Sequence, residues 1–443
     1  MKEGITMSQS TIVLIILGIF IVSLLMNKWS FGITGITTCI LLFLFYYKGD
    51  IGAAFSGLTN QVIFLMVGMY GLSAAFARTS LLKKMQEILN SLQGKKGIFL
   101  VLCIFGVAFL FGNFFPSAVT VSLMMTFVAT LGNENAISSD RLCVPIAGIA
   151  GMSMGVLPMG SALVSYTAMN AFYEGMITDA RQLVTMWDPF KMGIPMFLFG
   201  FIWCLIGYKI QPQKGRAILS TTKKDNGQKK SAASKAPLSK RDETIVYLCF
   251  GGTMIALFLS NQLGNFVYGV PIIADLILLY TKAIPNRDMV LSVCSPTSFM
   301  VIGILSMSNA LGASGAGEIL GNAVLKLMGS NPSPMLAFFV VMIATVIMTS
   351  LMSNIPTNAV LCPIVAAMAI AAGWNPVPFV IVVRKLAWCA ILLPSGSSAC
   401  AMAHATSEQL LSDSLKFSVP FVLFTMAGAV VSVFLFFPNI GGF

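Results

Sequence analysis

Long apolar segments follow one another along the whole chain. In the first half they cover residues 11–27, 30–47, 60–77, 98–131, 142–172 and 190–208. In the second half they cover residues 245–260, 265–281, 295–311, 333–372, 377–405 and 415–437. A helix needs about 20 predominantly apolar residues to cross the hydrocarbon core of a bilayer. The pattern predicts an all-α polytopic membrane protein.

The composition supports this prediction. Apolar residues make up 57% of the chain and charged residues only 10%, whereas soluble domains contain about 25% charged residues. This balance excludes a water-soluble enzyme and a disordered chain. The long runs also differ from the short alternating segments of a transmembrane β-barrel. Nine cysteines without a Cys-x-x-Cys pair give no sign of a disulfide or zinc framework.

Four apolar segments are interrupted near their middle. The interruptions lie at 112–116, 158–161, 353–358 and 394–397 and are rich in Gly, Pro, Asn and Ser. Residues 112–119 resemble 353–360, and residues 157–161 resemble 393–397. Asn354 follows Asn113 by 241 positions, and Pro394 follows Pro158 by 236. The shared order and spacing predict an internal repeat.

Basic loop residues predict the orientation. Ten Lys and Arg residues lie between Lys209 and Arg241, with Asp225 as the only acid among them, so we expect this loop in the cytoplasm. If 98–131 is a re-entrant hairpin, each half has five transmembrane helices plus one hairpin, and both termini are external. An odd number of crossings inverts the second repeat. The expected domains are 11–208, the basic linker 209–244 and 245–437, in the cell (inner or plasma) membrane.

Broken helices at matching positions are typical of secondary transporters that bind their substrate near the midplane. A break frees backbone carbonyls, which with Asn and Ser oxygens suit a cation such as Na⁺. The N-terminus of the half-helix beyond each break suits an anion. The alternative for any single break is a packing position, because small residues and Pro kinks are common between membrane helices.

The interrupted segments resemble those of the divalent anion/sodium symporter family, within the wider ion transporter superfamily. That family carries Ser-Asn-Thr-Ala-Thr at each hairpin tip and a Pro-x-Gly-Thr-type break in the following helix. Residues 353–357 keep its Ser, Asn and final Thr, and residues 157–161 and 393–397 keep its Pro. Phe114 and Ile355 stand where the family has Thr. The resemblance implies Na⁺ symport of di- or tricarboxylate-like anions, a homodimer and an elevator-type movement.

These patterns give a predicted site without catalytic residues or organic cofactors. The anion-binding residues are expected to be Asn113, Ser117, Ser161, Asn354, Thr357 and Ser397. The expected Na⁺ ligands are Gly112, Asn113, Gly160, Ser353, Asn354, Asn358 and Gly396. Candidate coupling residues are Asp275, the one carboxylate inside an apolar run, and His404, the only histidine. The expected partners are a small anion, Na⁺, lipid and a second copy, with no nucleic acid.

Two rival functions remain. One is a proton-coupled antiporter or a metalloid-anion permease of the same superfamily. The other is an intramembrane enzyme built on Ser397 and His404, but seven helical residues separate these side chains by about 10 Å. Arg384 and Lys385 lie nine to ten residues before Pro394. We therefore expect both at the membrane interface, and no Arg or Lys in the anion site.

Overall fold

A computed structural model describes the chain over residues 8–26, 28–76, 78–80, 87, 97–115, 117–130, 140–157, 161–177, 179–211, 238–329, 332–407 and 409–442. Most of the basic linker, most of the charged stretch 78–96 and the predicted break residues 158–160 lie outside the described residues. The expected ligand Gly160 is among these.

The first half consists of helices that end or break where the sequence loses its apolar run. The long elements are α1 (Gln9–Met26), α2 (Phe31–Leu41), α4 (Gln61–Phe76), α6 (Ile98–Phe114), α7 (Ser117–Thr130), α8 (Asp140–Ser153), α9 (Ser161–Ala171) and α10 (Asp188–Gly207). Short turns between them are η1 (Leu42–Tyr46), α3 (Ile51–Ala54), η2 (Ser56–Thr59), η4 (Glu174–Met176), η5 (Ala180–Gln182) and η6 (Tyr208–Ile210).

The second half also consists of helices. They are α11 (Lys240–Phe258), α12 (Ser260–Leu263), η9 (Gly264–Gly269), α13 (Val270–Tyr280), α14 (Asn286–Val293), α15 (Pro296–Ala313), α16 (Ala316–Met328), α17 (Pro334–Leu351), α18 (Asn354–Ala371), α19 (Pro376–Trp388), η10 (Pro394–Gly396), α20 (Ser398–Ser407) and α21 (Leu411–Phe436). The described residues form no strand, which confirms the all-α class.

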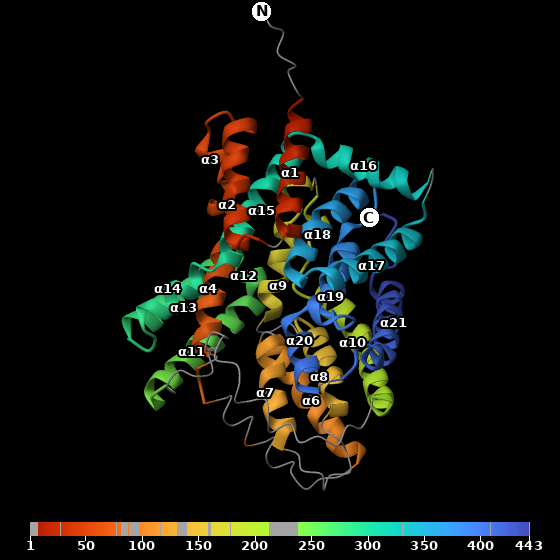
Figure 1. Ribbon diagram of the computed structural model, residues 1–443. Coiled ribbons are helices and arrows are strands. Elements are labelled where there is room, and N and C mark those ends of the chain that lie inside the picture. Colours follow the sequence, from red (N-terminus) through yellow and green to blue (C-terminus); the bar gives the residue numbers. More distant parts are fainter. Residues whose placement is uncertain are drawn as a thin grey trace, which may run out of the picture.

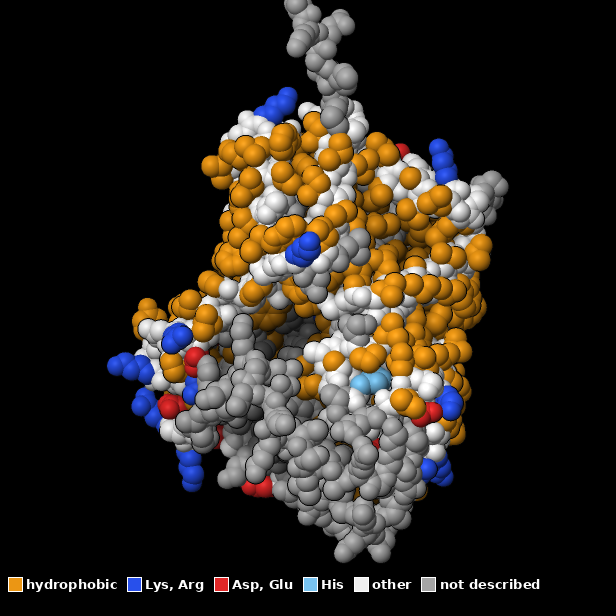
Figure 2. All heavy atoms as spheres, in the orientation of Figure 1, with side chains coloured by type: hydrophobic (Ala, Val, Ile, Leu, Met, Phe, Trp, Pro, Cys, Tyr) orange, Lys and Arg blue, Asp and Glu red, His pale blue; other side chains and the backbone are white. Residues whose placement is uncertain are grey.

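The surface fits a membrane protein. Five helical segments are long and apolar enough to span a bilayer, and further apolar helices are shorter; the five are Asp188–Ile210, Pro296–Ala313, Pro334–Leu351, Asn354–Ala371 and Leu411–Phe436. Figure 2 shows hydrophobic side chains over most of the described surface of one face, with charged side chains mostly toward its ends. Large exposed side chains such as Phe266 and Leu327 are therefore expected to contact lipid rather than water.

The two halves interlock through close helix crossings. Helix α10 lies along α21 (Figure 1), where a Cβ on Gly428 would come within 2.6 Å of the Met196 backbone. Helix α2 crosses α15 in the same manner, because a Cβ on Gly35 would lie 2.3 Å from the Phe299 carbonyl oxygen. Only glycine permits these backbones to touch.

The segment 334–371 forms a hairpin that returns to the end of the molecule from which it starts. Pro334, at the start of α17, lies against Gly441. Asn375, which follows α18, donates its backbone N–H to the carbonyl of Ile440 at 3.2 Å. Both arms therefore end beside the same C-terminal residues.

Two hydrogen bonds join the start of the chain and the end of α10 to distant segments. Near the chain start, the Ser10 hydroxyl donates to the carbonyl of Ser314, just before α16. After α10, the carbonyl of Gln211, where the basic linker begins, accepts from the Arg141 guanidinium. The sides of the membrane on which the termini and the linker lie stay a prediction.

Candidate functional site

The first hairpin tip is fastened to the first helix break. Asn113 is fully buried in the last turn of α6. Its Nδ2 donates to the Phe109 carbonyl at 2.9 Å, and its Oδ1 accepts the backbone N–H of Leu157 at 2.8 Å. Leu157 lies in the unwound segment after α8. Gly112 allows the close approach, since a Cβ there would lie 2.7 Å from Ser153 Cβ.

The second hairpin tip gathers the side chains predicted for it. Asn354 begins α18, and its Oδ1 is buried without a hydrogen-bond partner among the described residues. The Thr357 hydroxyl donates to the carbonyl of Ser353 at 3.1 Å. Asn358 Nδ2 donates to the carbonyl of Asn354 at 2.7 Å. One amide oxygen and the N–H groups of Asn354 and Ile355 therefore have no partner within α18, because Pro356 has no N–H and the N–H of Thr357 donates to Ser353.

The second helix break lies directly under this tip. A Cβ on Gly396 would sit 2.9 Å from the carbonyl oxygen of Thr349, in the last turn of α17. Ser397 donates its hydroxyl to the carbonyl of Ala390 at 3.2 Å and accepts the N–H of Cys400 at 3.1 Å. Ser397 thus orders both sides of the break, and its single proton is already donated within the protein.

The structure corrects the pairing of the two tips. Helix α17 ends at Leu351, 237 positions after Phe114 ends α6, and α18 begins at Asn354, 237 positions after Ser117 begins α7. The pairing of Asn113 with Asn354 was therefore wrong by four residues, about one helical turn. The Pro at 116 favours an extended residue before it, and Phe115 is extended with φ −119° and ψ 153°. The break thus follows Asn113 but precedes Asn354.

The corrected pairing identifies a residue that sequence comparison missed. Thr120 takes the place of Thr357, since it follows Ser117 as Thr357 follows Asn354. Thr120 is fully buried, and its hydroxyl has no partner among the described residues. Ser117 itself is half-buried at the start of α7. Ser161 begins α9, and its side chain lies outside the description.

The two apolar residues at family Thr positions pack away from polar groups. The ring of Phe114 stacks on Phe76 of α4, with centroids 6.1 Å apart, and Phe76 also stacks on Phe250 of α11 at 4.2 Å. Ile355 is half-buried against an apolar cluster that α1 forms together with α17, α18 and α19. Phe114 therefore ties the first hairpin to the α4 and α11 side of the molecule.

The expectation of interfacial basic residues is wrong for Lys385. This side chain is 5% exposed. Its Nζ donates to the carbonyl oxygens of Gly155 at 2.6 Å and Met154 at 3.2 Å. The guanidinium of Arg384 lies 3.5 Å over the ring of Trp388. The sequence prediction used the distance along α19 from Lys385 to the break at 394–397. In the structure, α19 contacts α8, and Lys385 lies at the residues that follow α8, next to the break at 158–161.

The two candidate coupling residues lie in different places. Asp275 of α13 is buried against α4, where a Cβ on Gly71 would lie 2.2 Å from its Oδ2, and its Oδ1 has no partner among the described residues. His404 lies in α20, with Nδ1 2.9 Å from the carbonyl of Cys400 and Nε2 buried without a described partner. Of these two residues, only His404 lies in a helix that begins directly after a predicted break, at 394–397.

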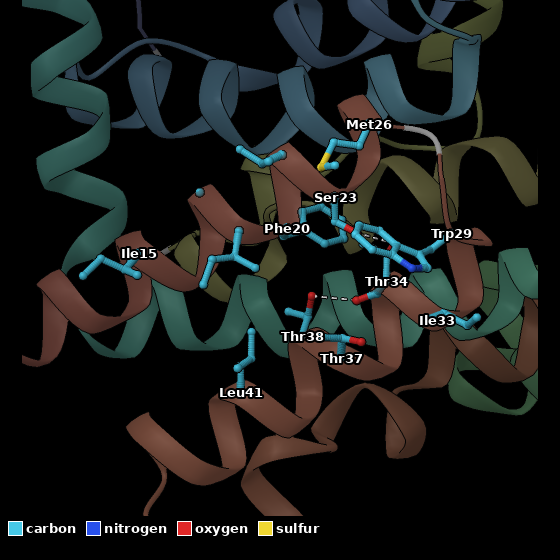
Figure 3. Close-up of a pocket in the computed structure, with 13 residues that line it drawn as sticks. Ile15, Phe20, Ser23, Met26, Trp29, Ile33, Thr34, Thr37, Thr38 and Leu41 are labelled. Atoms are coloured by element: carbon cyan, nitrogen blue, oxygen red, sulfur yellow. Dashed lines mark hydrogen bonds between the residues drawn. The ribbon is translucent and has the colours of Figure 1, made fainter.

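A separate groove lies between α1 and α2 and has a volume of about 640 Å³. Figure 3 shows that apolar side chains such as Ile15, Phe20 and Trp29 line it. Its hydroxyls bond within the protein, for example Ser23 with Thr34 at 2.9 Å. Neither helix contains a break, so the groove is not the predicted anion site.

The polar groups at the two tips are of kinds that bind ions. Among the described residues, no group of three His, Cys, Asp or Glu side chains could hold a metal ion. The polar groups at the tips are amides, hydroxyls, carbonyls and helix N-termini. These groups bind monovalent cations and anions without forming covalent bonds.

Comparison with known proteins agrees with this assignment. The family described as "Citrate transporter" (CitMHS) matches residues 11–384. The uncharacterized transporter YfbS of Escherichia coli (strain K12) is 28% identical over 185 residues, which are 42% of this chain and 30% of that protein. The matched region thus spans less than a third of that relative. The crystal structure of the Alcanivorax borkumensis YdaH transporter, described as having an unusual topology, superposes with a TM-score of 0.61 at 11% identity, over 94% of this chain and 100% of that one.

Proposed function

The chain belongs to the citrate transporter family (CitMHS), and from this premise we propose that it is a secondary transporter that couples the uptake of small carboxylate anions to Na⁺. The proposed substrates are di- and tricarboxylates. The proposed movement is of the elevator type, in which the hairpins and broken helices cross the membrane together. A homodimer is part of the proposal.

One observation carries the proposal: the open oxygen of Asn354 lies at the start of α18, above the second break. A buried amide oxygen without a partner costs free energy unless a ligand satisfies it, and Na⁺ is such a ligand. The N–H groups of Asn354 and Ile355 in α18, and of Ser398 and Ala399 in α20, have no intrahelical acceptor. They carry partial positive charge that favours a carboxylate.

The proposed ligands follow from this arrangement. At the second tip, Na⁺ is bound by oxygens of Ser353, Asn354, Asn358 and Gly396, and at the first by Gly112, Asn113 and Gly160. The anion lies between the tips against Asn113, Ser117, Ser161, Asn354, Thr357 and Ser397. Bound Na⁺ would hold the tip in the shape that accepts the anion, which is the basis of coupling.

Uptake into liposomes tests the proposal. The purified protein is reconstituted, and radiolabelled citrate and succinate are supplied with an inward Na⁺ gradient at equal pH on both sides. We expect Na⁺-driven accumulation that Asn354→Ala abolishes and Ser30→Ala, a change in the cap of α2, leaves intact. Anion uptake that ignores Na⁺ would contradict the coupling, and no uptake of any carboxylate would contradict the substrate class.

Proton coupling is the second candidate, and the buried carboxylate of Asp275 favours it. An intramembrane acid without a basic partner is stable mainly in its neutral form, so it can carry a proton. The same liposomes with an inward pH gradient and no Na⁺ distinguish the two. Uptake under these conditions that Asp275→Asn abolishes would support the proton-coupled alternative.

A further inference from the structure

The Lys385 ammonium lies against two backbone carbonyls in the unwound segment after α8. The carbonyls of Met154 and Gly155, which accept its protons, follow the last residue of α8. Carbonyls at the C-terminal end of a helix lack intrahelical donors and carry partial negative charge. A bound Na⁺ at a broken helix is held by carbonyls of the same kind.

The surroundings fit an ammonium group closely. In the described part of the chain, no carboxylate lies within 4.0 Å of Lys385 Nζ, so carbonyl dipoles replace the water that burial removed. Across from it on α10, a Cβ on Gly193 would lie 2.9 Å from Nζ and 3.2 Å from Cε. Glycine at 193 therefore leaves the room that the ammonium occupies.

Among the described residues, no Lys or Arg side chain donates to a carbonyl at the other break. Helix α19 begins 236 positions after α8, so the counterpart of Lys385 in the first half is Ile149, which is fully buried and apolar. At the second break, neutral hydroxyl groups donate to the backbone carbonyls: Thr349 donates to the carbonyl of Ala387, and Ser397 donates to the carbonyl of Ala390. The open oxygen of Asn354 remains at that tip.

We propose that Lys385 is a tethered cation that takes the place of a coupling ion at the first break, so that only the second tip binds Na⁺. This inference rests on the proposed function and narrows it, since the first of its two Na⁺ sites is then replaced by the Lys385 ammonium at the carbonyls of Met154 and Gly155. The lysine charge stays with the protein and balances the partial negative charge of the carbonyls at the first break in every step of transport. Transport of the substrate is then coupled to Na⁺ at one site instead of two.

The test measures Na⁺ binding directly, without substrate. Melting temperatures of the purified protein are recorded against NaCl, with choline chloride keeping the ionic strength constant. We expect wild type to respond to Na⁺ and Asn354→Ala to lose the response. The double variant Lys385→Ala, Asn354→Ala should regain a Na⁺-dependent rise, because the vacated carbonyls then accept Na⁺. Lys191→Ala in the Asn354→Ala background is the matched control, since Lys191 pairs with Asp188 near the surface, and should regain nothing.

Two outcomes would overturn the inference. The first is a folded double variant without any Na⁺ response, which would make Lys385 a structural cap only. The second needs no lysine change: an Asn354→Ala protein that still responds to Na⁺ and loses this response on Asn113→Ala. If Lys385→Ala does not fold, the Asn354→Ala and Asn113→Ala measurement tests the inference instead. We also expect methylammonium to restore folding of Lys385→Ala. A wild type that ignores Na⁺ would contradict the proposed coupling, while the double variant still tests Lys385.

Discussion

Gly151 is the residue at which a single added methyl group tests the whole site architecture. It lies in the last turn of α8, and a Cβ there would come within 2.2 Å of the carbonyl oxygen of Trp388, at the end of α19. Ordinary contact begins at 3.4 Å, so Gly151→Ala must separate the two helix ends by about 1.2 Å. Neither partner is a flexible side chain tip, so backbone must move.

The size of the effect follows from this overlap. Overpacking of a closely packed interior costs about 1–3 kcal/mol. Since about 1.4 kcal/mol changes an equilibrium constant tenfold, we expect anion affinity to fall about five- to 150-fold. Both unwound segments begin at this crossing, which is why the loss should appear in binding as well as in stability.

The assay compares Gly151→Ala with Gly106→Ala by thermal unfolding and by substrate binding in detergent. Gly106 is also inside a helix, but a Cβ there would meet nothing within 4 Å. Alanine is favoured over glycine in a helix by about 0.5–1 kcal/mol, so Gly106→Ala should be neutral or slightly stabilising. If the two variants have equal stability and equal affinity, the proposed contact between α8 and α19 is wrong.

Further predictions concern the tips and the linker. Asn354→Ala should weaken the Na⁺ dependence of uptake more than Asn113→Ala does, because Asn113 Oδ1 already accepts a backbone N–H; the reverse ranking would refute this. The Thr357 hydroxyl now donates to the carbonyl of Ser353, and we propose that anion binding turns it to the carboxylate. Thr357→Ala should then raise the anion dissociation constant about ten- to hundredfold, by loss of a hydrogen bond worth about 1.5–3 kcal/mol, measured by titration calorimetry. Ile355→Thr should improve succinate binding in the same titration, and unchanged affinity would contradict a role for this position. Asp225→Cys on a Cys-free background should resist an impermeant thiol reagent on intact cells, whereas labelling would exclude a cytoplasmic linker.

Hydrophobic pattern predicted the helices well because membrane burial is decided locally. The interruptions at 353–358 and 394–397 became real breaks, since Pro and Gly act on the backbone wherever they stand. The pairing of the two tips failed because it matched residue types, whereas the position of each break depends on backbone geometry. Asn113 lies in the last turn of α6, before Pro116, while Asn354 is the first residue of α18, after Ser353.

The sequence of one helix does not show which other helix its side chains will contact, so contacts between crossing helices could not be predicted. Lys385 was placed by its distance along α19, and nothing in the sequence shows that α8 ends against it. The glycines at 151 and 193 were the available signal, because a small residue marks close approach without naming the partner. The open hydroxyl of Thr120 was hidden by the wrong pairing of the tips.

The bond between Asn113 and Leu157 has a consequence for the timing of transport. If the first tip moved alone, the N–H of Leu157 and the side-chain oxygen of Asn113 would lose their hydrogen bond. Each unpaired buried group costs about 1–3 kcal/mol of free energy. A lifted tip would therefore be populated well below one molecule in ten. The first hairpin cannot serve as a fast independent gate. In the proposed elevator mechanism, exchange of substrate on that side would instead wait for the slower displacement of the tip and the broken helix as one body, and this step would set the turnover rate.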